Sequence, residues 1–279
     1  MMRILLGTTM FAGLLVAGAA QAADMPLKAQ RAAPQYFTWT GCYIGVNAGW
    51  GRAEHDLSTF AAGAPNNINN TARTAINNAG LASINGDGFT GGGTVGCNWQ
   101  SNNWVWGIEG DFNFANFDAD RNTGNVVEPV SGRTVRSIDS VGTDWFATLR
   151  GRFGIAFDRV LIYGTGGAAF AKFDITKRFA WDFIDGCPIV GGLQECHVGG
   201  ISDTRIGWVA GGGIEWAFAS GWSVKGEYLF ADFGSVSYTT ANVGPGFVGA
   251  GNTQLATHSV DTTVQIVRFG LNYRWGAAY

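Results

Sequence analysis

Gly41-Cys-Tyr-Ile-Gly-Val-Asn-Ala-Gly-Trp50 is a stretch in which two kinds of residue alternate. The even-numbered positions, from Cys42 to Trp50, are apolar, while the odd-numbered positions between them are Tyr, Gly, Asn and Gly. Alternation of apolar with small or polar residues over about ten positions is typical of a strand that crosses a membrane in a β-barrel. The stretch therefore predicts a strand with one face in lipid and the other toward a barrel interior.

The same period of two recurs along the rest of the chain. The further expected strands are 89–99, 104–114, 145–155, 160–173, 206–218, 222–230 and 267–275. Because Gly and Ala fill both faces of segment 160–173, its facing cannot be assigned from the pattern. With the opening strand, these segments predict an all-β fold, an eight-stranded antiparallel up-and-down transmembrane β-barrel over residues 40–279.

The predicted links between these strands alternate in length. The short links are residues 100–103, 157–159 and 219–221, and the long ones lie near 53–87, 118–140, 174–204 and 234–260. Barrels of the outer membrane have short turns on the periplasmic side and long loops outside. We therefore expect both termini in the periplasm and the long loops on the cell surface.

The composition fits a barrel in lipid. Gly accounts for 43 of 279 residues and charged residues for only 14 %, against about 7 % and about 25 % in ordinary soluble domains. The chain contains 11 Trp, which a soluble domain with so few charges would tolerate poorly. A net charge of −3 argues against a nucleic-acid partner, which would require a basic face.

The N-terminus has the features of a secretory signal peptide. Arg3 precedes an apolar run, Ile4 to Ala20, which is followed by the cleavage pattern Ala20-Gln21-Ala22. We expect residues 1–22 to be removed and 23–39 to form a periplasmic lead. The alternative is a permanent membrane anchor, but the apolar run is short and the cleavage pattern follows it directly. We therefore expect the protein to be exported and, as a β-barrel, to lie in the outer membrane of a Gram-negative cell.

Aromatic residues gather at the expected strand ends and predict two membrane-interface girdles. Trp50 lies toward the outer rim with Phe114, Trp145, Trp208 and Phe230, and the periplasmic rim has Trp99, Trp104, Trp216, Trp222, Tyr273 and Trp275.

The inward positions of the expected strands include an unusual number of charged residues. They are Glu109, Asp111, Arg150, Arg152, Glu215, Lys225, Glu227, Arg268 and Arg274. An eight-stranded barrel has an interior just wide enough for side chains, and charges there must be paired or hydrated. We expect a lumen plugged by ion pairs. A charge-lined conduction path is the alternative, because the many inward glycines leave room for water.

The four cysteines of the mature chain allow three pairings. Cys42 and Cys97 lie on neighbouring expected strands, near the same rim and on the same outward face, so a bridge between them is feasible. Cys187 and Cys196 fall within one long loop. We predict 42–97 and 187–196 disulfides, with free thiols at small outward positions as the alternative.

No motif in the sequence predicts a catalytic or cofactor site. His55, His197 and His258 fall in the expected outer loops, where they would most often be solvated rather than hold a metal or haem iron. Gly91 to Gly96 matches the G-x-G-x-x-G pattern, but no helix follows it, so we interpret it as strand glycine. The chain has no Walker lysine motif, no G-x-S-x-G and no H-E-x-x-H, and we expect neither an enzyme nor a cofactor.

Several blocks together resemble the small outer-membrane β-barrel family of alphaproteobacteria, which includes outer-membrane immunogenic proteins and opacity-type porin-family surface antigens. They are Phe37 to Trp50, Gly107 to Phe112, Trp145 to Arg152, Tyr163 to Ala168, Trp222 to Tyr228 and Val267 to Arg274. The resemblance covers the strands and not the long loops. It implies a barrel similar to the transmembrane domain of outer membrane protein A, with surface-antigen function and, in some relatives, haemin binding.

One feature departs from the family pattern. Such barrels usually end on an aromatic residue, but Trp275 is followed by Gly276, Ala277, Ala278 and Tyr279. Either Trp275 or Tyr279 is therefore a candidate for the end of the last strand.

The function expected from these observations is a structural surface barrel that contributes to envelope integrity and presents its loops outside. The alternative is a narrow porin-like channel for water or small solutes. An outer-membrane enzyme acting on lipid is a third hypothesis, but the His positions provide no catalytic pair. The expected partners are outer-membrane lipid, the barrel assembly machinery and an extracellular ligand at the loops.

Overall fold

The structure is a computed structural model that describes residues 37–61, 74, 77–78, 80–124, 126–127, 132, 134–181, 196–242 and 255–275. Residues 36–279 form a compact unit separate from residues 1–35, and only the former includes described residues. The predicted signal peptide and most of the predicted lead therefore lie outside the described residues.

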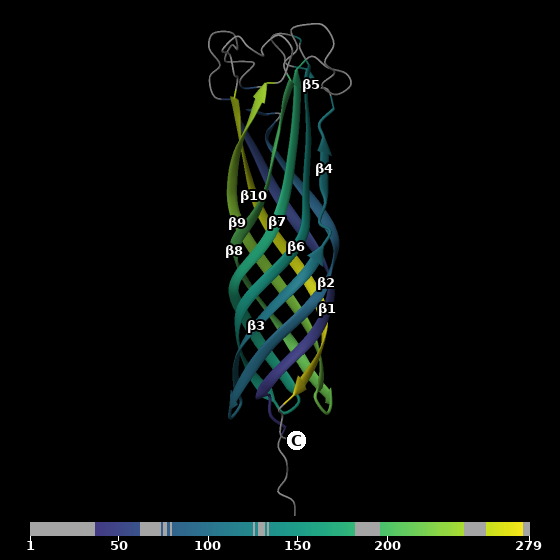
Figure 1. The fold of residues 1–279 in the computed structure, drawn as a ribbon, viewed down its shortest axis with the longest axis vertical. Helices are drawn as coiled ribbons and strands as arrows, with labels where there is room; N and C mark the ends of the chain where they lie inside the picture. The colour runs from purple at the N-terminus through teal and green to yellow at the C-terminus, as the bar shows by residue number, and fades with distance from the viewer. Residues whose placement is uncertain are drawn as a thin grey trace, which may run out of the picture. The chain divides into compact units, whose positions relative to one another are not determined.

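Eight long strands close into a ring (Figure 1). They are β1 (Gly41–Ala61), β2 (Ala82–Ser101), β3 (Trp104–Ala115), β6 (Thr134–Phe157), β7 (Val160–Trp181), β8 (Cys196–Ala219), β9 (Trp222–Asn242) and β10 (Leu255–Trp275). Each strand pairs antiparallel with its neighbours in the chain, and β1 pairs with β10 to close the ring. Two short strands, β4 (Ala119–Asn122) and β5 (Val126–Val127), continue the β3 side of the hairpin with β6. The predicted eight-stranded antiparallel barrel is confirmed.

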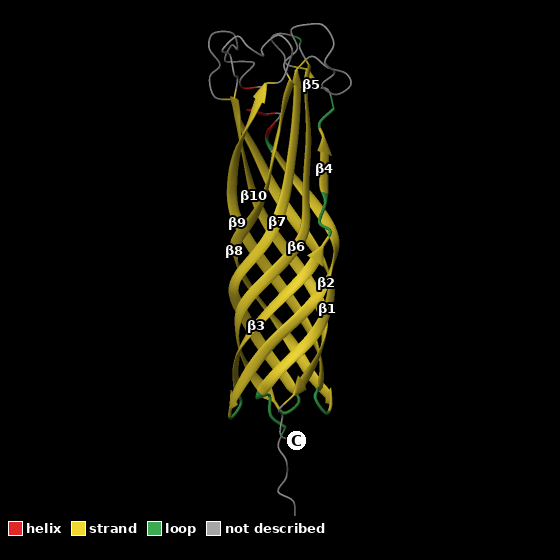
Figure 2. Cartoon of the chain, in the orientation of Figure 1, coloured by secondary structure: helices red, strands yellow, loops and turns green. Residues whose placement is uncertain are grey.

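Three two-residue turns connect the strands at one end of the barrel, the lower end in Figure 2. Asn102 and Asp158 have positive φ angles of 52° and 51°, and Gly221 has a φ of 75°. Asn, Asp and Gly are the residues that most readily adopt this left-handed conformation. These turns lie within the three short links that the sequence predicts.

The strands are longer than the sequence pattern predicts, and the four long loops are correspondingly shorter. β1 extends to Ala61 and β2 starts at Ala82, although the first loop was expected over 53–87. β4, β5 and β6 occupy much of 118–140, and strands likewise reach into 174–204 and 234–260. The prediction was wrong because the outward positions become polar beyond Trp50, which ends the apolar alternation, while the inward positions and the hydrogen-bonded pairing continue.

The structure assigns the facing that the pattern left open. Leu161, Tyr163, Ala169 and Phe173 of β7 are buried in the barrel interior. At the other end of the chain, β10 ends at Trp275, whereas Tyr279 lies outside the described residues. Among the residues described, none forms a helix long and apolar enough to span a membrane.

Candidate functional site

The middle of the barrel interior contains a network of eight charged side chains, which we call the lumen network. β3, β6, β8, β9 and β10 contribute them from their inward positions, and each is at most 7 % exposed. The members are Glu109, Asp111, Arg150, Arg152, Glu215, Lys225, Glu227 and Arg268. All eight belong to the set of nine inward charges that the alternation predicts.

Arg150 connects three carboxylates at the centre of the network. Its Nη1 donates to Glu227 Oε1 at 3.0 Å, and its Nη2 lies 3.0 Å from Asp111 Oδ2. Nη2 also forms an ion pair with Glu109, which stands directly opposite Arg150 in the β3–β6 register. A guanidinium presents five N–H donors in a fixed plane, so it can satisfy several carboxylates at once.

Arg268 binds two of the same carboxylates from β10. Its Nη2 lies 2.6 Å from Glu227 Oε2 and 3.0 Å from Asp111 Oδ2. Lys225 approaches Glu109 from β9, with Nζ 2.7 Å from Oε2. The network therefore joins strands from opposite sides of the ring.

Arg152 forms the part of the network nearest the turns. Its Nη2 donates to Glu215 Oε2 at 2.8 Å, and its guanidinium carbon lies 3.9 Å from the centre of the Tyr163 ring. Tyr43 accepts a hydrogen bond from Arg152 Nη1 at 2.8 Å and donates one to Glu109 Oε2 at 2.6 Å. The sequence prediction missed both tyrosines, although the inward position of Tyr43 was a usable signal.

The lumen network is balanced in charge. Its four cations are Arg150, Arg152, Lys225 and Arg268, and its four anions are Glu109, Asp111, Glu215 and Glu227. Burying an isolated charge costs several kcal/mol, and only well-placed opposite charges and hydrogen bonds offset that cost. The balance and the short contacts account for the burial of the eight charges of this network.

Apolar side chains close the lumen on the turn side of the network. Trp39, Val105, Ala156, Leu161 and Ala217 pack together there, all at most 3 % exposed. Trp39 comes from the end of the predicted lead, and its indole N–H donates to the carbonyl of Asp158 at 3.0 Å. We call this group the turn-side cap.

Arg274, the ninth predicted inward charge, lies at the turn-side end of the lumen. Its guanidinium carbon is 4.8 Å from the ring centre of Phe37 and 5.1 Å from that of Trp39. Arg274 is only 6 % exposed and so completes the turn-side cap.

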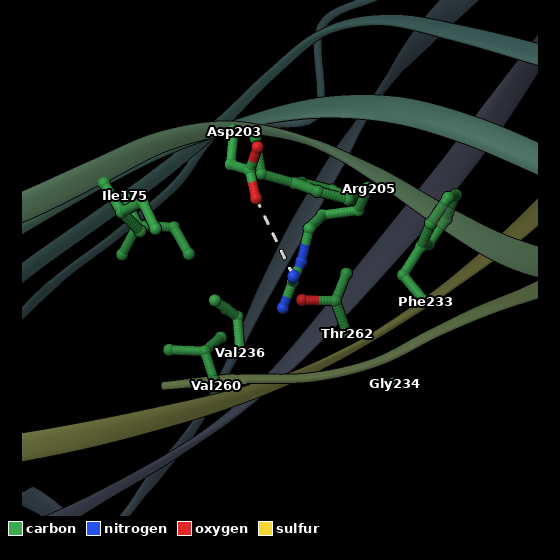
Figure 3. Close-up of a pocket in the computed structure, with 10 residues that line it drawn as sticks. Ile175, Asp203, Arg205, Phe233, Gly234, Val236, Val260 and Thr262 are labelled. Carbon is green, nitrogen blue, oxygen red and sulfur yellow. Dashed lines mark ion pairs between the residues drawn. The ribbon is translucent and has the colours of Figure 1, made fainter. Parts of the chain in front are cut away.

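A larger apolar cluster closes the lumen on the other side of the network. Phe117, Phe146, Phe173 and Phe233 are at most 6 % exposed and form its centre. Phe173 and Phe233 meet edge to face with ring centres 5.1 Å apart. We call this group the outer cap; a small pocket opens beside it between β8 and β9 (Figure 3).

The histidines do not lie in loops, contrary to the sequence prediction. His55 on β1 and His258 on β10 point into the lumen and are at most 1 % exposed. His55 Nδ1 is hydrogen-bonded to Thr262 Oγ1 at 3.0 Å, and His258 Nδ1 to Thr59 Oγ1 at 2.9 Å. Their positions were mispredicted because the strands continue beyond the apolar alternation. His197 lies on β8, also outside a loop.

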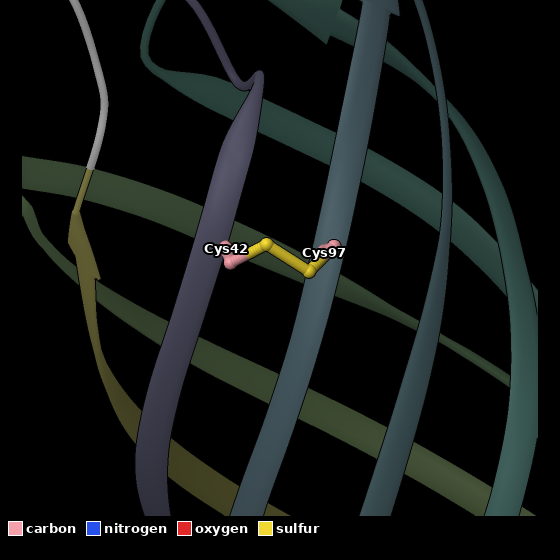
Figure 4. The surroundings of a disulfide bond; sticks show 2 residues. All are labelled: Cys42 and Cys97. Carbon is pink, nitrogen blue, oxygen red and sulfur yellow. A yellow bond between two sulfur atoms is a disulfide. The ribbon is translucent and has the colours of Figure 1, made fainter.

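The described residues contain no group of three or more His, Cys, Asp or Glu side chains placed to hold a metal ion. The cysteines on β1 and β2 have a structural role instead. Cys42 and Cys97 stand opposite each other in the register and form a disulfide, as predicted (Figure 4). The predicted 187–196 bridge lies outside the described side chains.

The outer wall of the barrel has an apolar zone and a polar zone. From Ile44 to Trp50 the outward side chains of β1 are apolar and exposed, whereas the polar Arg52, Glu54 and Asp56 follow. We call the apolar zone the lipid band. Most of the predicted interface aromatics are exposed on this wall, whereas Trp145 and Phe230 are half-buried. The exposed ones are Trp50, Trp99, Trp104, Phe114, Trp208, Trp216, Trp222, Tyr273 and Trp275.

Comparison with known proteins identifies relatives of this chain. The family model for the outer membrane protein beta-barrel domain matches residues 9–247. The 31 kDa outer-membrane immunogenic protein of Brucella melitensis is 31 % identical over 269 residues, which cover 94 % of this chain and 95 % of that protein.

Solved structures of outer-membrane proteins resemble the chain more distantly. The outer membrane protein OprG of Pseudomonas aeruginosa is 12 % identical, with a TM-score of 0.44 and 85 % of this chain and 98 % of that chain covered. The outer membrane protease OmpT of Escherichia coli is 10 % identical, with a TM-score of 0.42 and coverages of 86 % and 98 %.

Proposed function

Because this chain belongs to the family of outer membrane protein β-barrel domains, we propose that it is a structural surface barrel with a closed lumen. In this role it spans the outer membrane, adds to the integrity of the envelope and presents its outer end to the surroundings. Its partners are the lipid of the outer membrane and the machinery that inserts barrels into it.

The observation that carries the proposal is the sequence of three closed layers inside the barrel. The turn-side cap, the lumen network and the outer cap follow one another along the axis, and their central side chains are buried. An ion could pass only if salt bridges such as Arg150–Glu109 and Arg268–Glu227 opened together. Breaking buried ion pairs without replacing their partners costs several kcal/mol.

The wall supports an orientation with the turns in the periplasm. From Cys42 to Trp50, eight steps of about 3.3 Å at a tilt of about 40° give a lipid band roughly 20 Å high, which is close to the band height of known outer-membrane barrels. β1 then continues to Ala61. With the short turns inside, this outer half of the barrel projects from the cell surface, as a surface antigen requires.

The test is planar-bilayer conductance of the refolded mature protein, with a heat-modifiable gel shift to verify the folded barrel. We expect no steady openings from the wild type or from Arg178→Ala, an exposed outer-wall control. Arg150→Ala, which removes the central cation of the lumen network, is measured alongside the wild type and Arg178→Ala.

Steady wild-type openings whose ion selectivity changes with Arg150→Ala, but not with Arg178→Ala, would contradict the closed-lumen proposal. They would assign the chain to the alternative function, a narrow channel for water or small solutes. A silent bilayer with a clean gel shift supports the structural role.

A further inference from the structure

The barrel wall is interrupted between β8 and β9 in its outer half. The two strands pair from Ala219↔Trp222 to Trp208↔Asp232, and pairing resumes only at Val198↔Ala241. Over residues 199–207 and 233–240 the strands have no ladder between them, although both remain extended. We call this interruption the window.

A bulge in β9 produces the window. Phe233 and Gly234 together stand opposite a single residue of β10, Thr262. Gly234 has a φ of 61°, and its N–H donates to Asp232 Oδ1 at 2.8 Å. A bulge of this kind bends its strand and increases the local twist, which turns β9 away from β8.

Exposure of lumen-facing residues shows that the wall is open at the window. Asp203 and Arg205 occupy inward positions of β8, in phase with the fully buried Val209. Yet their side chains are 51 % and 26 % exposed, respectively. Another seam, where β2 runs beyond the end of β3, is filled, because the backbone of residues 116–118 lies directly against Gly86 and Gly88.

Behind the window lies a pocket with apolar walls. Its lining includes Phe173, Ile175, Ile201, Phe233, Val236 and Val260, with Thr262 at one side. The cavity volume is about 10 Å³, room for about one water molecule. In its present state the pocket is therefore too small for a molecule larger than water.

Arg205 is the side chain that spans the window. Its Nη2 donates to the carbonyl of Ser235 on β9 at 2.9 Å, and its Nη1 lies 3.7 Å from Asp203 Oδ2. In Figure 3 the Arg205–Asp203 pair on β8 faces Val236, Val260 and Thr262. Arg205 thus forms a side-chain hydrogen bond between β8 and β9 where the two strands have no backbone pairing.

We propose that the window is a lateral portal for small apolar molecules about the size of a single aromatic ring, with Arg205 as its latch. Release of Ser235 by Arg205 opens the apolar pocket beside Phe233. The outer cap and the lumen network seal the route toward the turns, and buried side chains such as Lys177, Thr240 and His258 fill the lumen on the other side of the pocket, so the molecule enters and leaves sideways. It emerges next to Ile206 and Trp208, which are exposed on the lipid-facing wall at 69 % and 51 %.

The proposal is tested with fluorobenzene and ¹⁹F relaxation on the full mature chain in lipid nanodiscs. A nitroxide is attached at Ser202→Cys, on the outer face of the window, in a background with Cys187→Ser and Cys196→Ser. The matched control is Ser83→Cys on β2, also exposed on the outer half of the wall but on the opposite side of the ring. The two labels broaden the ¹⁹F line of fluorobenzene dissolved in the lipid to the same extent.

We expect line broadening that saturates with fluorobenzene concentration at the Ser202 label and not at the Ser83 label. Arg205→Ala removes a hydrogen bond from a charged donor that holds the pocket shut, so apparent affinity should rise about tenfold. Deletion of Gly234 restores the one-to-one pairing of β9 with β10 and should abolish saturable binding. Val236→Trp fills the pocket from its wall and should have the same effect without altering the backbone.

Equal, unsaturable broadening at both labels in every variant would overturn the portal. So would saturable binding that survives both Val236→Trp and the deletion of Gly234. Neither result bears on the closed lumen, which bilayer conductance tests separately.

Discussion

At the scale of single residues, Glu109 is the carboxylate on which most of the lumen network converges. It pairs with Arg150 and Lys225, and Tyr43 donates to it at 2.6 Å. Glu109→Gln would leave four buried cations facing three anions. We expect a loss of about 3–5 kcal/mol in the free energy of unfolding, measured by urea unfolding of the barrel refolded in lipid vesicles.

Glu54→Gln is the control for this substitution. Glu54 lies on the outer wall, 3.4 Å from Arg52 Nε, with 41 % of its side chain exposed. Exposed ion pairs contribute about 0–1 kcal/mol, so the control should unfold like the wild type. Equal, small effects of the two substitutions would mean that water reaches the lumen network.

We expect His55 to make the folded barrel sensitive to acid. Burial lowers the pKa of His55 from 6.5 to about 4, against a smaller opposing effect of Asp56. Above pH 6.5 the imidazole is neutral in both the folded and the unfolded chain. As pH falls from 6.5 toward 4, only the unfolded chain takes up the proton, so up to about 3 kcal/mol of stability is lost.

Urea unfolding between pH 7.5 and pH 4 measures this loss. His55→Asn keeps a polar group near Thr262 Oγ1, the present partner of His55, but does not titrate. Its stability should fall less than that of the wild type across this range. The same slope in both proteins would show that other groups cause the acid sensitivity.

The sequence allowed the facing of charged residues to be predicted, but not their partners. Glu109 and Arg150 follow the inward parity of their strands, which the alternation alone identifies. Arg268 meets Asp111 across 157 residues of chain. That contact depends on the stagger of the closed ring, which no local pattern specifies. The inward position of Tyr43 follows from the alternation, but its hydrogen-bond partners depend on the same stagger.

At the scale of the strands, the Cys42–Cys97 disulfide ties β1 to β2 across 55 residues. Closing a loop of this length lowers the entropy of the unfolded chain, which corresponds to about 4 kcal/mol at most. Replacing both residues with Ala suits their outward position in the lipid band. We expect a lower urea midpoint for the double variant.

Reducing agent provides the control for the disulfide. In a background with Cys187→Ser and Cys196→Ser, which removes the other predicted bridge, it should lower the midpoint to that of the Cys42→Ala/Cys97→Ala variant and leave the variant itself unchanged. A wild-type midpoint that does not respond to reduction of this bond would show that β1–β2 pairing alone holds the hairpin.

The ends of the strands were the part of the fold that the sequence predicted poorly. In the lipid band both faces of a strand are constrained, so the alternation in Gly41 to Trp50 is strong. Beyond Trp50 the outward positions are mostly polar, as at Arg52 and Asp56, whereas inward residues such as Ala53 and Leu57 remain apolar. The window could not be predicted from the sequence either. A glycine in a bulge, such as Gly234, differs from an ordinary strand glycine only in its backbone conformation.

At the scale of the whole molecule, the boundary of the lipid band is open to chemical labelling. Val46 and Ser58 both face outward on β1, on either side of Trp50. A membrane-impermeant maleimide should label Ser58→Cys on intact cells and leave Val46→Cys unlabelled. The physical reason is that water reaches the projecting half of the wall, whereas lipid covers the band.

Permeabilised cells complete this experiment. If Ser58→Cys reacts only after permeabilisation, the barrel is inserted with its turns outward, contrary to the proposed orientation. If both positions react on intact cells, the lipid band is lower than the outward residues indicate.

The placement of opposite charges on β9 has a consequence for assembly. Lys225 stands opposite Glu215 of β8, and Glu227 stands opposite Arg268 of β10. A slip of two residues keeps every side chain on its proper face, so the apolar pattern does not oppose it. Between β8 and β9, such a slip would place Glu215 opposite Glu227 in one direction and opposite uncharged Ser223 in the other. Between β9 and β10, it would place Arg268 opposite Lys225 in one direction and opposite uncharged Leu229 in the other. The buried charges therefore favour one register of the strands during assembly over the registers that are shifted by two residues.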